Sequence, residues 1–343
     1  MQSFFTMKIN HTILFAFFAL FFFAGCRPSS STYIRVEGAM LGTQMRVIAD
    51  LKDCSSTELY SRIMAIDQEM KASMSIFDEN SLLSRLNRGQ TDSIDEHIRY
   101  NFELAGKIHR MSDGAYDITV KPLVEAWGFA GKHQLPDPNI DSLLEFVGYD
   151  KVSIEGNRLI KSDPRIQLDF NSIAKGYTVD LVAELVERLG AENYLVDIGG
   201  ELRCKGVSQR GAGWRIGVET PFDGNMTDGK YLQKRIQMSE GGMATSGNYR
   251  RYYTTQTGEK VAHTIHPKTG RSALSKLLSV TVISENCAQA DALGTMFLAM
   301  GAEQAMEKVK TMPQAKVYFI FAGDDEQAYK EYISPCMEQM IMK

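Results

Sequence analysis

The chain has 343 residues and a formal net charge of −4, and 44% of its residues are hydrophobic. This length is enough to bury a large core, in one large domain or two modest ones. Lysines and arginines are scattered along the chain, which argues against the concentrated basic surface of a nucleic-acid-binding protein. The composition therefore favours a small-molecule or protein partner.

The N-terminus carries the pattern of an export signal. Lys8 precedes a thirteen-residue apolar run, Ile13–Gly25, which is too short to cross a membrane comfortably and is typical of a signal peptide over residues 1–25. Small residues followed by Cys26 resemble a bacterial lipobox and predict lipidation of that cysteine. A cleaved signal with an incidental cysteine is the alternative. In either case the chain leaves the cytoplasm.

Beyond the signal, the sequence divides into a tether and a body. The polar stretch after Cys26 predicts a lipid-anchored tether over residues 26–37, and residues 38–343 form the globular body. No internal repeat suggests a solenoid. The remaining cysteines lack a metal-finger spacing and are compatible with at most two disulfides or with free thiols: Cys54, Cys204, Cys287 and Cys336.

Apolar periodicity predicts the elements of the body. Four stretches have the spacing of helices, and three have the character of strands. Gly190 and Gly301 follow the last two helical stretches and predict their ends. Together these elements indicate an α+β fold with mixed sheets and packed helices. The predicted helices are 59–70, 98–108, 177–189 and 288–300, and the predicted strands are 194–198, 280–284 and 317–321.

The sequence lacks the two common nucleotide-binding motifs, the Rossmann glycine pattern and the P-loop, so a nucleotide must be held another way. Residues 168–177 place a polar turn between a strand and a helix start, where backbone amides can receive phosphate oxygens. Lys175 lies at this helix start, where the helix dipole disfavours a cation. Its position predicts an anionic neighbour.

Two further patterns carry candidate chemistry. Asp291 and Thr295 are four residues apart on a predicted helix, so both side chains can touch the same hard cation, although such pairs also bond locally. The small residues around them favour a bound ion or phosphate. His263 and His266 precede a turn, and no third ligand nearby completes a zinc site. These histidines suit a phosphate hydrogen bond or a general base better.

Several of these segments, in this order, resemble the ApbE family, whose members are FAD:protein FMN transferases. The similarity runs from about Gly38 to the C-terminal region. The densest match comprises the blocks around Lys175, Gly200 and Ser246. The resembling segments are 38–43, 74–87, 114–129, 168–177, 196–201, 244–252, 263–270 and 290–295.

The chain departs from the family pattern at a few of these positions. Leu41 replaces a Met, and Asn171-Ser172 replaces a Gly-Gly. Glu201 and His266 each replace an Asp. The implied metal-binding residues match the family pattern.

The resemblance implies an ApbE-like fold and a site for FAD and magnesium. Mg²⁺ would be bound by Asp291, Thr295 and the backbone carbonyl of Ala174. Lys175 would offset charge on the phosphate oxygens, and His263 would activate the acceptor hydroxyl. The residues implied in cofactor binding are Leu41, Phe77, Ala115, Tyr116, Asp117, Asn171, Lys175, Tyr177, His263, Ile265 and Gly294.

The implied reaction transfers FMN from FAD to a Ser or Thr hydroxyl of a target flavoprotein, with release of AMP. By resemblance, the partners are extracytoplasmic flavoprotein subunits of membrane redox complexes, and lipidated Cys26 would hold the chain at the periplasmic side of the inner membrane. An FAD pyrophosphatase that gives FMN and AMP is one alternative. A non-catalytic flavin-binding lipoprotein is another, and it would not need Asp291 or Thr295.

Overall fold

The computed structural model describes residues 33–129, 138–221, 232–248, 252–254, 260–273, 275–323 and 329–342. The predicted signal peptide and Cys26 lie outside these ranges. None of the helices within them is long and apolar enough to cross a membrane. The first strand, β1 (Ile34–Met40), includes residues 34–37, which the sequence assigned to the tether. These residues belong to the sheet because β1 pairs with β2 (Thr43–Ala49) along its whole length and buries Val36.

The central element is an eight-stranded sheet in the order β1-β2-β5-β6-β9-β12-β13-β14, in which every neighbouring pair is antiparallel. Alternating residues of its strands face two different cores. In β12, for example, Val280 and Val282 belong to the core under the helices, whereas Ile283 belongs to the core on the opposite face. The remaining strands are β5 (Tyr194–Ile198), β6 (Glu201–Lys205), β9 (Glu240–Gly247), β12 (Leu277–Ser284), β13 (Lys316–Ala322) and β14 (Tyr329–Ile333).

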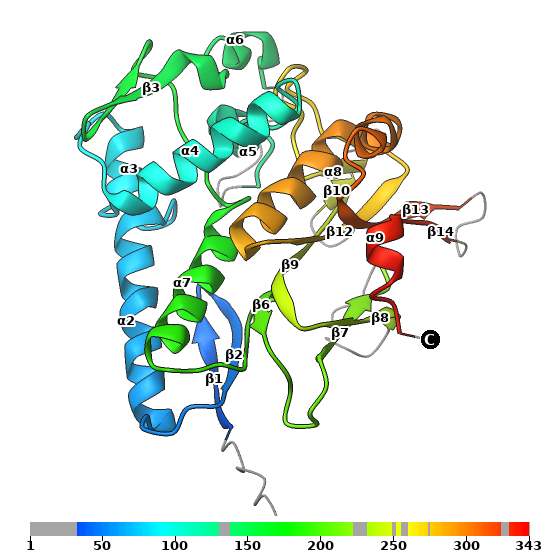
Figure 1. Cartoon of the computed structure of the whole chain (residues 1–343). Helices are drawn as coiled ribbons and strands as arrows, with labels where there is room; N and C mark the ends of the chain where they lie inside the picture. The colour runs from blue at the N-terminus through cyan, green and yellow to red at the C-terminus, as the bar shows by residue number, and fades with distance from the viewer. Residues whose placement is uncertain are drawn as a thin grey trace, which may run out of the picture. The chain divides into compact units, whose positions relative to one another are not determined.

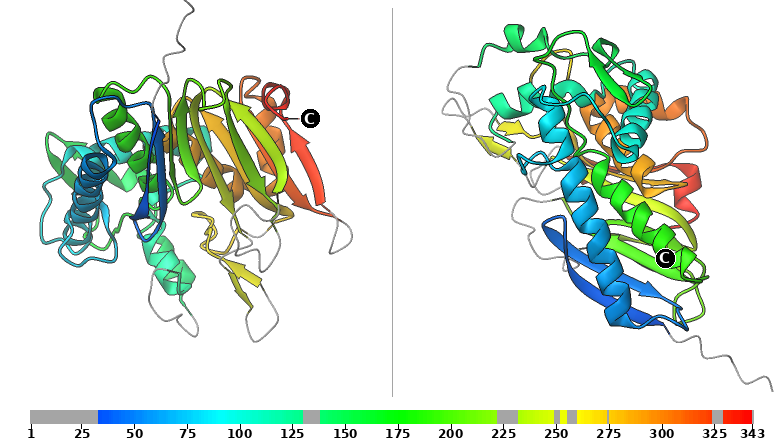
Figure 2. Two further views of the ribbon diagram at one scale, coloured as in Figure 1. Left: turned by 90° about the horizontal axis from the view of Figure 1, so that it is seen from below. Right: turned by 90° about the vertical axis from the view of Figure 1, so that its left-hand side faces the viewer.

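Three long helices, α2 (Ser56–Met74), α7 (Ala174–Arg188) and α8 (Cys287–Lys310), cover one face of the sheet (Figures 1 and 2). The hairpin of β7 (Trp214–Glu219) and β8 (Leu232–Met238) contributes to the opposite core. The smaller elements are α3 (Leu82–Asn87), α4 (Glu96–Met111), α5 (Lys121–Ala126), α6 (Ile140–Leu144), α9 (Pro335–Glu338), the 3-10 turns Ile118–Val120 and Tyr149–Lys151, and the hairpins β3 (Val152–Glu155) with β4 (Arg158–Lys161) and β10 (Tyr252–Thr254) with β11 (Lys260–Ala262).

The structure confirms the predicted helices, strands and α+β fold class. Gly190, with φ 93°, follows the end of α7 as predicted. Gly301 interrupts the helical backbone with φ 75° and ψ 176°, but a second helical segment follows at once, so α8 continues across a kink to Lys310. The four cysteines of the body are free thiols, and Cys54, Cys204 and Cys287 are buried.

Glycines let α7 and α8 approach each other and the sheet closely. A Cβ on Gly176 would lie 2.5 Å from the carbonyl oxygen of Cys287, and one on Gly242 in β9 would lie 2.2 Å from the Cys287 nitrogen. Both neighbouring atoms belong to the backbone, which cannot swing aside as a side chain can. The first turn of α8 is therefore packed between α7 and β9.

We expect Gly176→Ala to lower the free energy of unfolding by about 1–3 kcal/mol, because the added methyl overpacks the contact between α7 and α8. Urea unfolding followed by circular dichroism measures this change. Gly38→Ala is the matched control: the added Cβ would meet the ring of Tyr60 at 2.8 Å, and this ring is 40% exposed and can move away. Equal losses in the two variants would contradict the packing argument.

Candidate active site

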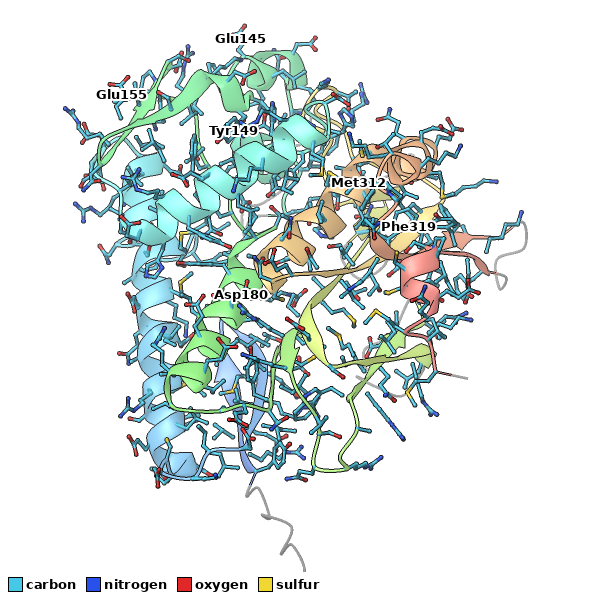
Figure 3. The ribbon with its side chains drawn as sticks, in the orientation of Figure 1. Glu145, Tyr149, Glu155, Asp180, Met312 and Phe319 are labelled. Carbon is cyan, nitrogen blue, oxygen red and sulfur yellow. The ribbon has the colours of Figure 1, made fainter. Side chains whose placement is uncertain are left out.

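The N-termini of α7 and α8 are each completed by a carboxylate from the other helix. Asp291 of α8 accepts a hydrogen bond from the Gly176 nitrogen at 3.0 Å through Oδ2. Asp180 of α7 accepts from the nitrogens of Cys287 and Ala288 at 2.9 and 2.8 Å. Figure 3 labels Asp180 on α7. Because helix N-termini carry unsatisfied N–H groups and partial positive charge, both contacts stabilise the pair of helices.

The predicted anionic neighbour of Lys175 is Glu201. The Lys175 Nζ lies 2.5 Å from Glu201 Oε2, and the Glu201 side chain is only 6% exposed. Glu201 is the first residue of β6 and follows a turn formed by Gly199 and Gly200, both with positive φ. This glycine turn directs Glu201 toward the start of α7.

Burial raises the pKa of the two carboxyl groups near Lys175. For Asp291, burial is the main cause, and the negative charge of Glu201 adds to it. For Glu201, burial raises the pKa and the nearby Lys175 opposes the shift. Burial disfavours the charge on Lys175 too, but Glu201 and Asp291 outweigh it and raise the pKa of the lysine. A cation beside Asp291 would favour its ionised form.

The residues present fit a magnesium ion. Thr295 is half-buried on α8, one turn beyond Asp291. The Ala174 carbonyl, at the first residue of α7, accepts from Thr178 Oγ1 at 2.7 Å. These are hard oxygen donors, which Mg²⁺ prefers. The described residues contain no group of three or more His, Cys, Asp and Glu side chains that could hold a metal, so a metal at Asp291 would take its other ligands from water and substrate.

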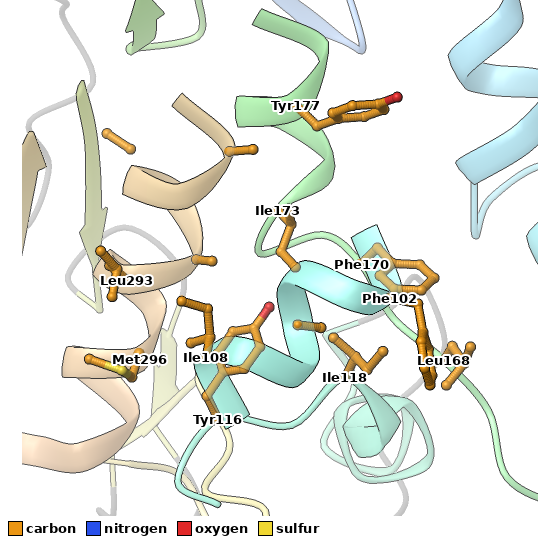
Figure 4. Packing of buried hydrophobic residues seen from close by; sticks show 14 of the residues in the cluster. Phe102, Ile108, Tyr116, Ile118, Leu168, Phe170, Ile173, Tyr177, Leu293 and Met296 are labelled. Atoms are coloured by element: carbon orange, nitrogen blue, oxygen red, sulfur yellow. The ribbon is translucent and has the colours of Figure 1, made fainter. Parts of the chain in front are cut away.

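Ala115 and Tyr116 are core residues beside the predicted phosphate-binding turn. Both are at most 4% exposed, and Figure 4 shows the Tyr116 ring beside Leu293 and Met296 of α8. The Tyr116 hydroxyl lies 2.7 Å from Ser172 Oγ. Asn171 is exposed, and its nitrogen donates to Asp169 Oδ1 at 2.8 Å. The buried Tyr116 thus supports the turn through Ser172, while Asn171 of the same turn remains accessible.

The side chain of Asp117, a predicted cofactor contact, makes its hydrogen bonds within the protein. Its Oδ1 accepts from the nitrogen and the hydroxyl of Thr119 at 2.8 and 2.6 Å. Its Oδ2 accepts from the Tyr149 nitrogen at 2.8 Å and lies 3.4 Å from His109 Nδ1. The side chain is buried, and both oxygens are engaged within the protein. Asp117 is therefore part of the scaffold.

Tyr177 likewise lies away from the Asp291 face of α7. Its ring stacks on Tyr100 with centroids 4.6 Å apart, and its hydroxyl lies 3.1 Å from His97 Nδ1. Figure 4 shows it pointing away from α8. Neighbouring helix residues point about 100° apart, so Gly176 faces Asp291 and Tyr177 faces α4. Its cofactor contact stays a prediction, and its ring and hydroxyl contact α4.

Two other predicted cofactor contacts are packing residues here. Ile265 is 5% exposed and belongs to an apolar cluster with Leu123 and Val147. Gly294 lies against β9, where an added Cβ would meet Ser246 Oγ at 2.7 Å. Their side-chain positions are explained by packing, so any contact of theirs with a ligand would be through the backbone.

Leu41 and Phe77 remain candidates for contact with an apolar ring. Leu41 has φ 49° in the turn between β1 and β2, and its nitrogen donates to the buried Asp67 at 2.9 Å. Its side chain is half-buried. Phe77 follows α2 and is 71% exposed, which is unusual for so large an apolar side chain.

His263 is connected to the α8 side of the site through β9. Its ring meets the edge of the Phe129 ring at a centroid distance of 6.3 Å. The next residue, Thr264, donates to Asn248 Oδ1 at 2.7 Å, and Asn248 lies two residues beyond Ser246, the neighbour of Gly294. Tyr249 and Arg251, which belong to a resembling segment, lie outside the described residues.

His266 belongs to the turn itself. Its Nδ1 accepts from the Lys268 nitrogen at 3.2 Å, and burial followed by repulsion from Lys268 lowers its pKa. The neutral imidazole is therefore favoured. Sequence reasoning missed Asp180, although an acidic residue between the apolar Val179 and Leu181 on a helix was a usable signal.

An antiparallel sheet covered by helices, with a half-buried lysine and buried carboxylates at one helix start, defines an α+β protein with a candidate anion- and cation-binding site. The defining sequence pattern of the ApbE family matches residues 41–319. The chain belongs to the ApbE family.

Curated relatives and solved structures agree with this assignment. The FAD:protein FMN transferase of Vibrio cholerae is 33% identical over 96% of this chain and 99% of the relative. The FAD:protein FMN transferase of Escherichia coli K12 is 31% identical over 98% of this chain and 99% of the relative. The crystal structure of the flavin transferase ApbE from Vibrio cholerae superposes with a TM-score of 0.80 at 32% identity, over 90% of this chain and 99% of that one. The structure of the apo flavinyl transferase ApbE of Pseudomonas stutzeri also superposes with a TM-score of 0.80, at 27% identity, over 90% of this chain and 96% of that one.

We expect Asp117→Asn to lower the free energy of unfolding by about 1–3 kcal/mol, because the amide leaves buried donors without an acceptor. The affinity of the folded variant for FAD should be unchanged, as measured by titration calorimetry. Asp92→Asn, which removes an exposed partner of Arg158, is the control and should cost less than about 1 kcal/mol. Weaker FAD binding without loss of stability would restore Asp117 to the site.

Proposed function

We propose that the chain is an FAD:protein FMN transferase. In this reaction the hydroxyl oxygen of an acceptor Ser or Thr bonds to the FMN-side phosphorus of FAD. The bond from that phosphorus to the bridging oxygen breaks, and AMP leaves. The observation that carries the proposal is the buried group of Lys175, Glu201 and Asp291 at the start of α7, together with the curated relatives named for this activity.

The start of α7 is suited to a pyrophosphate. Its first N–H groups and the helix dipole favour an anion, and the ammonium of Lys175 adds a positive charge. The Lys175 side chain is 35% exposed although its counter-ion is buried. Glu201 therefore holds the lysine in place while part of the lysine side chain remains accessible. This arrangement suits stabilisation of charge on phosphate oxygens.

The magnesium ligands in this proposal are Asp291, Thr295 and the Ala174 carbonyl. The ion would offset negative charge on the phosphate oxygens. One oxygen of Asp291, Oδ2, accepts from Gly176, and the other would be available to the ion. In our proposal His263 takes the proton of the acceptor hydroxyl, and the hydrogen bond of the next residue, Thr264, to Asn248 fixes the backbone beside it.

The transferase proposal is tested by incubating the protein with FAD, Mg²⁺ and an extracytoplasmic flavoprotein subunit that carries a Ser/Thr acceptor. We expect the acceptor to gain the mass of FMN in step with AMP release. Asp291→Asn should reduce the rate at least about 10- to 100-fold, because it removes the carboxylate charge from the metal site while an amide oxygen can still accept from Gly176. Mass spectrometry and chromatography of nucleotides give the two readouts.

The outcomes separate the alternatives. AMP and free FMN without labelled acceptor would identify an FAD pyrophosphatase instead. FAD that binds and remains intact in the presence of Mg²⁺ would leave a flavin-binding lipoprotein. Asp163→Asn is a matched control, since Asp163 pairs with Arg165 at 2.7 Å and has no part in the proposed site.

We further propose that lipidation of Cys26 anchors the protein at the periplasmic side of the inner membrane, beside flavoprotein subunits of membrane redox complexes. The support is the apolar run that ends at Gly25. A tether between this cysteine and β1 would leave the body free to meet its partner.

Cys26→Ser should move the protein from the membrane pellet to the soluble periplasmic fraction, or leave its signal uncleaved, because the lipid attachment is lost. Fractionation and the mass of the mature protein measure this. Cys336→Ser is the control, since Cys336 is a partly exposed free thiol in the body. A lipid-free mature mass for the unaltered protein would contradict the anchor.

A further inference from the structure

The charges at the start of α7 are paired with strand β6 in a specific pattern. β6 carries Glu201 and Arg203, two residues apart and hence on one face of the sheet. Glu201 pairs with Lys175 at 2.5 Å, and Arg203 pairs with Asp180 at 3.1 Å. The two charged residues of α7, Lys175 and Asp180, are thus each paired with an oppositely charged residue of β6.

Asp291 is the carboxylate left over. It is 5% exposed, and no ion pair involves it in the part of the chain that the structure describes. Its one hydrogen bond there comes from the nitrogen of Gly176, the residue directly after Lys175. The Lys175 ammonium is therefore held by Glu201 although a second buried carboxylate lies close by. Two cations against three carboxylates leave one negative charge, at Asp291.

An ammonium in the first turn of α7 needs a nearby anion, because both burial and the helix dipole disfavour its charge. Without Glu201, Asp291 is the remaining carboxylate within its surroundings. An ammonium at Asp291 would neutralise the carboxylate and repel a divalent cation. Whether Asp291 can bind a metal therefore depends on whether the Lys175 ammonium pairs with Glu201 or with Asp291.

We propose that Glu201 is a positioning residue that holds the Lys175 ammonium away from Asp291 and so keeps Asp291 free for a divalent cation. This inference rests on the metal site of the proposed function. The backbone before Glu201 is suited to the task. Gly199 packs against Thr43, and the Gly200 nitrogen donates to Asp197 Oδ1 at 3.1 Å, so the turn that presents Glu201 is held from two sides.

The test is the binding of Mn²⁺ to the full-length protein, followed by the electron paramagnetic resonance signal of the free ion, with and without FAD. Glu201→Gln keeps the shape of the side chain but not its charge, and should weaken Mn²⁺ binding about 10-fold or more. Adding Lys175→Met should restore the affinity to near the wild-type value, because no ammonium is left to occupy Asp291. Glu184→Gln, which removes an exposed carboxylate of α7 that pairs with Arg188 at 3.7 Å, should leave Mn²⁺ binding unchanged.

Recovery in the double variant is the decisive result, since a merely structural role of Glu201 would not produce it. Wild-type affinity in Glu201→Gln, or equal losses in the single and double variants, would overturn the proposal. If Glu201→Gln does not fold, Glu201→Ala, which also removes the charge, replaces it, with the same loss and the same recovery expected; unchanged binding in Glu201→Ala would then overturn the proposal. Absence of Mn²⁺ binding in the unaltered protein would instead overturn the metal assignment itself, and this inference with it.

Discussion

The exchange of carboxylates between α7 and α8 is the contact on which the site depends. Each helix places an aspartate on the N-terminal amides of the other, so the two helix starts can lie together only at one mutual offset. Gly176 permits the necessary approach, because any larger residue would strike the backbone of α8. The same offset brings the positive ends of both helices to one place. An anion-binding site is thus a direct consequence of how the helices pack.

The two aspartates of this exchange, Asp180 and Asp291, differ in how their oxygens are used. Asp180 uses both oxygens on backbone amides and also pairs with Arg203, and these contacts oppose the rise in its pKa that burial causes. Asp291 gives one oxygen to Gly176 and has no ion-pair partner among the described residues, and burial and the charge of Glu201 raise its pKa. A buried charge of this kind is costly unless a cation joins it. The difference between the aspartates therefore distinguishes the structural cap from the candidate metal ligand.

Sequence reasoning predicted the elements well because apolar periodicity reflects burial directly, as in α4 and β12. It also predicted that Lys175 needs an anion, but not which one, because Glu201 reaches it only through the register of the hairpin of β5 and β6. For a related reason, the sequence did not show that the side chains of Asp117 and Tyr177 make their contacts within the protein. A carboxylate that caps a turn and one that binds a ligand look alike in sequence, and a residue next to a site can point to the opposite side of its helix.

The small number of protein ligands at Asp291 has a consequence for the reaction. Asp291, Thr295 and the Ala174 carbonyl supply few oxygens, and one oxygen of the aspartate is already engaged. In the proposed metal site, water and pyrophosphate oxygens would supply the remaining ligands, so we expect FAD and Mg²⁺ to bind cooperatively. In this proposal the protein chiefly supplies charged groups at fixed positions. The nucleophile that attacks the pyrophosphate then determines the product. An acceptor hydroxyl gives transfer and water gives hydrolysis, so the balance between the two activities depends on the surface around the exposed Phe77 and His263 rather than on the buried charges.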